Sequence, residues 1–104
     1  MRTLLKVTMP VGPGAPSVKD GTIARILEET AKRLQPEASY FYPENGRRTA
    51  IMVFDLKNTA DIPVIAEPLF TELNGTVELY PVMNAEDLKK GLATYHEKSA
   101  ALNR

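Results

Sequence analysis

The sequence has no cysteine, no tryptophan and a single histidine in 104 residues. Without cysteine it forms no disulfide, offers no thiol nucleophile and provides no thiolate for a zinc ion or an iron–sulfur cluster. A metal site with two histidine ligands would have to be shared between two subunits. We therefore expect neither a metal nor a cofactor.

An excess of either charge is also absent, because 13 Lys and Arg residues balance 13 Asp and Glu residues. A neutral chain has no electrostatic reason to bind nucleic acid or an anionic membrane surface. The longest apolar run, residues 50–54, is far shorter than the roughly 20 residues that cross a bilayer. Prolines at positions 10, 13 and 16 interrupt the region that an export signal would keep apolar. We expect a cytoplasmic protein with no nucleic-acid or membrane partner.

The chain has the length and the ordinary composition of one domain, residues 1–104. Four segments have the pattern typical of strands: residues 2–9, 38–42, 49–56 and 76–83. The spacing of apolar residues predicts three helices, with apolar faces over residues 23–34, 62–73 and 88–102. The order β-α-β-β-α-β plus a C-terminal helix predicts an α+β, ferredoxin-like antiparallel sheet with strand order 4-1-3-2. Right-handed crossovers then place the first two helices on one face of this sheet.

Local signals refine these boundaries. Asn45-Gly46 predicts a type I′ hairpin turn between the second and third strands, because both central residues of this turn need a positive φ. The first helix is expected to begin at either Ser17 or Asp20 as its N-cap, and the last helix at Asn84. Pro68 falls inside the second helix, where it predicts a kink or a split into two short turns.

The third strand is apolar on both faces, with Ala50, Met52 and Phe54 on one face and Ile51 and Val53 on the other. An antiparallel strand with one face in water would alternate apolar and polar residues. We therefore expect an apolar cover on the face of the sheet that the first two helices leave bare. A second copy of the chain is the economical cover, because closed homodimers are the commonest assembly. The alternative is that the C-terminal helix folds over this face.

The element order, the two-sided third strand and residues 76–88 (TVELYPVMNAEDL) resemble small uncharacterised bacterial proteins of the dimeric α/β-barrel superfamily. The resemblance implies a homodimer in which two ferredoxin-like subunits pack sheet to sheet. Members include cofactor-independent monooxygenases, enzymes like muconolactone isomerase and chlorite dismutase, haem-degrading enzymes and many proteins of unknown role. No catalytic motif carries the resemblance, and His96 lies beside Glu97 on the last helix rather than at the expected cavity. The fold alone does not define the function.

Lys6 on the first strand and Glu78 and Tyr80 on the fourth point away from the aliphatic side of their own strands. A covering partner would partly desolvate them and shift their pKa values. Together with Met52 and Phe54, they are the candidate ligand-binding residues: an amine, a carboxylate and a phenol in an apolar cavity. The competing interpretation is an inter-strand ion pair between Lys6 and Glu78 at an ordinary subunit interface.

The function we favour from the sequence is binding of a small apolar or aromatic molecule in a cavity between the sheet and the partner of a homodimer. The alternative is a cofactor-independent enzyme of the isomerase or monooxygenase type, with Glu78, Lys6 or Tyr80 as the acid or base. No catalytic residue is assigned. The loop at residues 12–14 (GPG) lacks both the third glycine of GxGxxG and the Gly-Lys ending of a P-loop, so it predicts no phosphate site.

Overall fold

The computed structural model describes residues 1–102. Its strands are β1 (Arg2–Thr8), β2 (Ala38–Glu44), β3 (Arg47–Asp55) and β4 (Thr76–Pro81). Its helices are α1 (Thr22–Leu34), the short 3₁₀ turn η1 (Thr59–Asp61), α2 (Ile62–Leu73) and α3 (Ala85–Leu102). The strands and α-helices follow one another in the order predicted from the sequence.

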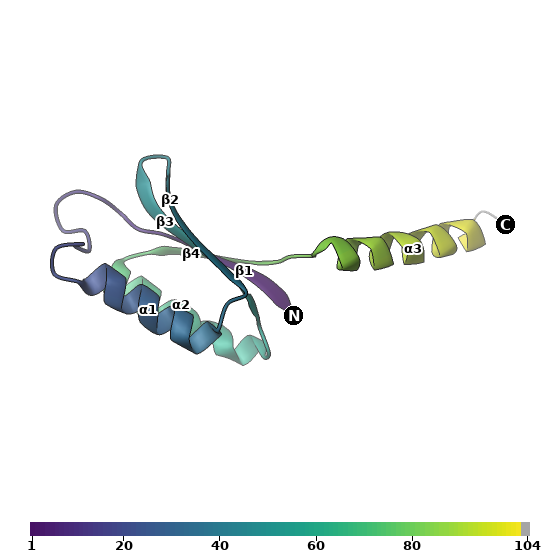
Figure 1. Ribbon diagram of the computed structural model, residues 1–104, viewed down its shortest axis with the longest axis horizontal. Helices are drawn as coiled ribbons and strands as arrows, with labels where there is room; N and C mark the ends of the chain where they lie inside the picture. The colour runs from purple at the N-terminus through teal and green to yellow at the C-terminus, as the bar shows by residue number, and fades with distance from the viewer. Residues whose placement is uncertain (103–104) are drawn as a thin grey trace.

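The strands form an antiparallel sheet in the order β2-β3-β1-β4. This is the predicted order 4-1-3-2 read from the opposite edge. Helices α1 and α2 lie side by side on the same face of the sheet (Figure 1). The fold is therefore α+β and ferredoxin-like, with an additional C-terminal helix, as predicted.

The hydrophobic core lies between the sheet and the layer formed by α1 and α2. In the two central strands, Leu5 pairs with Met52 and Val7 pairs with Ala50, and each of these side chains is at most 2% exposed. Leu69 of α2 packs against this layer and is 0% exposed. Because side chains alternate along a strand, the residues between these core positions point to the opposite face, which α1 and α2 leave uncovered.

The hairpin turn forms as predicted, whereas the start of α1 differs from the prediction. Asn45 and Gly46 have φ values of 52° and 75°, the pair of positive angles that a type I′ turn requires. The N-cap of α1 is Gly21, with φ 80°, and neither Ser17 nor Asp20 takes that position. Asp20 instead uses its Oδ1 to accept the N–H of Thr22 at 2.9 Å. Glycine fits the cap because it has no Cβ to strain at this positive φ.

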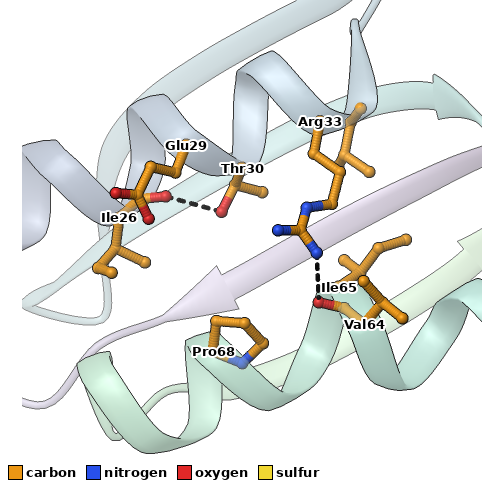
Figure 2. Close-up of a pocket in the computed structure, with 8 residues that line it drawn as sticks. Ile26, Glu29, Thr30, Arg33, Val64, Ile65 and Pro68 are labelled. Atoms are coloured by element: carbon orange, nitrogen blue, oxygen red, sulfur yellow. Dashed lines mark hydrogen bonds between the residues drawn. The ribbon is translucent and has the colours of Figure 1, made fainter.

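Helix α2 runs unbroken from Ile62 to Leu73 with Pro68 inside it, so the predicted split is wrong. Proline has no N–H, which leaves the carbonyl of Val64, four residues earlier, without its donor in the helix. Nη1 of Arg33 on α1 donates to this carbonyl oxygen at 3.3 Å (Figure 2). The neighbouring helix thus supplies a hydrogen bond where the proline removes one.

Helix α3 leaves the sheet after β4 and extends away from the rest of the chain (Figure 1). The described part of the molecule measures 64 × 28 × 19 Å, and no residue of α3 is buried. Asn84 begins the helix as predicted: its Oδ1 accepts the N–H of Asp87 at 2.8 Å, and Oδ2 of Asp87 accepts the N–H of Asn84 at 3.2 Å. The alternative that α3 covers the second face of its own sheet is therefore wrong.

Candidate functional site

The candidate site is the sheet face opposite α1 and α2, which we call the open face. Alternate residues of the four strands form it: Leu4, Lys6, Tyr40, Tyr42, Glu44, Ile51, Val53, Glu78 and Tyr80. At its centre, Lys6 of β1 lies opposite Ile51 of β3 and Glu78 of β4. Tyr40 and Tyr80 near its edges are 64% and 47% exposed. The central part of the face is mainly aliphatic and aromatic, with Lys6, Glu44 and Glu78 set among these side chains. The same alternation places polar residues toward its two ends: Thr8, Thr49 and Thr76 at one end, and Arg2 and Asp55 at the other.

Lys6 forms its ion pair with Glu44 at the end of β2, not with its cross-strand neighbour Glu78 as predicted. The pair is partly shielded from water, with side-chain exposures of 20% for Lys6 and 33% for Glu44. Oε1 of Glu44 also accepts a hydrogen bond from the hydroxyl of Tyr42 at 2.8 Å. The flexible amine of a lysine reaches further than one strand spacing, so strand pairing alone does not decide which carboxylate it meets.

The contacts of this cluster shift the pKa values of its members. The bond to Glu44 raises the pKa of Lys6, and partial desolvation only opposes this rise. The same bond lowers the pKa of Glu44, and the hydrogen bond from Tyr42 lowers it further. The hydrogen bond to Glu44 also raises the pKa of Tyr42. At neutral pH the cluster therefore holds one ammonium, one carboxylate and one protonated phenol.

Glu78 and Tyr80 form a second polar pair on the open face. The hydroxyl of Tyr80 donates to Oε2 of Glu78, both side chains lying on the same side of β4 two residues apart. This bond raises the pKa of Tyr80, and partial burial raises it further. Tyr80 accordingly keeps its proton at neutral pH and acts as a hydrogen-bond donor rather than as a base.

The structure separates the other two predicted site residues from this face. Met52 lies opposite Leu5 and Phe54 lies opposite Thr3, and both side chains are 2% exposed on the side of α1 and α2. Both residues belong to the core, so neither lines a cavity on the open face, and their prediction as ligand-binding residues of that face is wrong. In a strand that is apolar on both sides, the alternation of side chains predicts which residues share a face. It does not predict which of the two faces the helices cover.

Several grooves lie outside the open face. The groove between α1 and α2 in Figure 2, which includes Thr30 and Pro68, has a volume of about 30 Å³, which suits about one water molecule. A shallow groove of about 780 Å³ lies at the start of α3, between Phe54 and Met83. This second groove has the volume of an organic ligand site. Arg2, one of its lining residues, donates a hydrogen bond from Nε to Oε1 of Glu37 at 2.6 Å.

Residues 1–102 contain no cluster of three or more His, Cys, Asp or Glu side chains placed to hold a metal ion. In the same part of the chain, no helix is both long enough and apolar enough to cross a membrane. His96 lies on α3 beside Tyr95, with 5.7 Å between the ring centroids. The chemistry-bearing groups that the structure brings together are therefore those of the open face. Sequence reasoning missed Tyr42 and Glu44, although their alternation with Tyr40 along β2 places them there.

Comparisons with known proteins define the fold without defining the family. No protein-family model matches the sequence, and no curated protein matches it. Two crystal structures of formyltetrahydrofolate deformylases have a similar arrangement of strands and helices. The enzyme from Burkholderia mallei is 12% identical over 78% of this chain, with a TM-score of 0.50. The enzyme from Pseudomonas putida is 17% identical over 79% of this chain, with a TM-score of 0.49.

This chain spans 28% and 29% of the lengths of those two enzymes, so it corresponds to less than a third of either one. At such low identity, the likeness to the Burkholderia mallei enzyme concerns the fold alone. The fold and the site together thus define a ferredoxin-like α+β chain whose sheet has one covered face and one open face.

Proposed function

We propose that the chain is a homodimeric protein of the dimeric α/β-barrel type that binds a small apolar or aromatic molecule between the open face and the partner subunit. The observation that carries this proposal is the composition of the open face, where aliphatic and aromatic side chains surround the polar groups of Lys6 and Glu78. A pocket of this kind, mainly apolar with a few convergent polar groups, is typical of small-molecule sites.

The need for a partner follows from the apolar surface of the open face, whose aliphatic residues are only half-buried in the single chain. Leu4, Ile51 and Val53 form an aliphatic strip along the two central strands, and Tyr40 and Tyr80 flank it. A contiguous apolar patch on one face marks an interaction site more often than a surface meant for water. A second copy with the same face is self-complementary, because a twofold axis brings like surfaces together.

The polar groups of the open face indicate which chemical groups the small molecule carries. Glu78 presents a carboxylate that accepts hydrogen bonds, while Tyr80 and Tyr40 present aromatic rings on which a planar ligand stacks. A ligand with an aromatic or aliphatic body and one hydroxyl or amine group satisfies both requirements. Location in the cytoplasm of a bacterium stays a prediction from the sequence.

The second candidate function is a cofactor-independent enzyme of the isomerase or monooxygenase type. The Glu78–Tyr80 pair favours it, because a carboxylate beside a phenol combines a proton acceptor with a proton donor. The raised pKa values of Lys6 and Tyr80 keep both groups protonated at neutral pH, so neither serves as the base. In this candidate Glu78 is the base, and Tyr80 or Lys6 is the donor.

Native mass spectrometry of the freshly purified protein tests the proposal. We expect a dimer, with added mass from a co-purified molecule or with saturable binding of the neutral aromatic amine N-phenyl-1-naphthylamine, whose N–H can donate to the carboxylate of Glu78. Glu78→Gln should weaken binding while keeping the fold, and the matched control Glu86→Gln, on exposed α3, should not. A monomer at both low and high concentration, or probe binding that Glu78→Gln leaves unchanged, would contradict the proposal. Loss of turnover of an identified ligand in Glu78→Gln would favour the enzyme.

A further inference from the structure

Helix α3 carries an apolar surface that its own chain does not cover. It has 18 residues and none of them is buried. Leu88, Leu92 and Tyr95 are 47%, 49% and 63% exposed. With Leu102, and with Ser99 as a polar member, they recur at alternating spacings of four and three residues, which aligns them in one mainly apolar stripe along the helix. Helices of this length gain most of their stability from packing such a stripe, so the stripe requires a partner.

The start of α3 is fixed in a direction that keeps this stripe away from its own sheet. The N–H of Val82 donates to the carbonyl oxygen of Arg2 at 3.1 Å. Nη1 of Arg2 donates to Oδ2 of Asp87, in the first turn of α3, at 2.9 Å. Only residues 82–84 separate β4 from α3, so folding the helix back over its own sheet would break these contacts. The stripe must therefore pack against another molecule.

The charges beside the stripe complement those of the open face. At 3.6 residues per turn, Lys89 and Lys98 flank the stripe on its two sides, whereas Glu86 and Glu97 fall on the opposite side of the helix. Asp87 also lies on a flank, where the ion pair with Arg2 balances its charge. The open face presents Glu78, a carboxylate that takes part in none of the ion pairs among residues 1–102. A helix that approaches with lysines on both flanks supplies the missing countercharge.

The stripe also matches the open face in length. From Leu88 to Leu102 it runs about 21 Å at 1.5 Å per residue. From its first to its last residue, the seven-residue strand β1 at the centre of the sheet runs about 20 Å at 3.3 Å per residue. A helix laid along the central strands would therefore cover Leu4, Ile51 and Val53 over their whole extent.

We propose that, in the homodimer, α3 of each subunit crosses to the other subunit and lays its apolar stripe on the open face there. The exchange is reciprocal, so one twofold axis satisfies both helices and both sheets. This inference rests on the homodimer and the ligand site of the proposed function, and it changes one feature of the barrel type: the two sheets face each other across the α3 helices and are not in direct contact. Leu92 and Tyr95 of one subunit then form the cavity wall that faces Glu78 and Tyr80 of the other. The site is incomplete in a single chain.

The absence of cysteine allows a clean cross-linking test. Chains with Ile51→Cys and chains with Leu92→Cys, one of them lengthened by an affinity tag, are mixed, allowed to exchange subunits and oxidised mildly. We expect a disulfide between the two different chains, visible by non-reducing electrophoresis and by mass. The matched control replaces Ile51→Cys with Val64→Cys, which lies 50% exposed on α2 in the other layer, and should give no mixed disulfide.

The outcomes separate this inference from the proposed function. If the protein stays dimeric and disulfides form only between two chains that both carry Ile51→Cys, the two sheets are in direct contact. If disulfides form only between two chains that both carry Leu92→Cys, the two α3 helices pack against each other. Either result, or a dimer without mixed disulfide, overturns the exchange and leaves the homodimer standing. A monomer overturns both. A chain that ends at Asn84 provides a second test: it should keep its strand circular dichroism and lose the dimer, and a dimer that survives overturns the exchange.

Discussion

Replacing Leu92 by alanine should weaken the dimer without harming the isolated subunit. Leu92 is 49% exposed in the single chain, so about half of its side chain remains to be buried by a partner. Full burial of a leucine contributes roughly 1.5–3 kcal/mol, so the remaining half contributes about 1 kcal/mol. A twofold dimer contains this contact twice, and the loss of about 2 kcal/mol raises the dimer dissociation constant about 30-fold. Alanine is the best helix former, so α3 itself is not destabilised.

Sedimentation equilibrium over a dilution series measures this change. The control is Lys90→Ala, which removes a longer side chain from the far side of the same helix and should leave the dissociation constant unchanged. Thermal unfolding at a concentration where both variants are monomeric should give the same midpoint for both. Equal dissociation constants for Leu92→Ala and Lys90→Ala would refute the assignment of the stripe to the dimer interface.

Further predictions concern the core and the charged groups. Leu69→Ala, at a position with 0% exposure, should lower the free energy of unfolding by about 2–5 kcal/mol in urea denaturation, and a loss below about 1 kcal/mol would contradict the core assignment. The N-terminal amino group and then Lys57 lower the pKa of Asp55 from 3.8 to about 2. The stabilisation of the folded state by the ionised Asp55 is therefore complete above pH 3.8 and is lost as the pH falls toward 2. The difference in the free energy of unfolding between wild type and Asp55→Asn should shrink over that range, and a constant difference would contradict the pairing of Asp55. Lys6→Met should raise the pKa of Glu44 in a carbon-13 NMR titration, and an unchanged value would contradict the Lys6–Glu44 pair.

Features that depend on local chemistry could be predicted from the sequence. Asn45-Gly46 specifies its turn because few other residues adopt two successive positive φ angles. The sheet order follows from the element order and the handedness of crossovers. Asn84 and Asp87 form a capping box because the two groups lie within one turn of each other.

Features that depend on tertiary contacts could not be predicted. The carbonyl freed by Pro68 is satisfied by Arg33, a residue of another helix, so no pattern within residues 62–73 reveals that the helix survives. The partner of Lys6 depends on the reach of its side chain across β3, which strand pairing does not specify. Met52 and Phe54 share a face in the sequence pattern, but only the packing of α1 and α2 shows that this face is the core.

Native mass spectrometry at a dilute and at a high concentration would show whether the open face is covered by a second copy of the chain. We expect a species of twice the 11.5 kDa chain mass at the higher concentration, dissociating on dilution more readily for Leu92→Ala than for wild type. A folded monomer at both concentrations, with Leu4, Ile51 and Val53 left in water, would contradict this expectation.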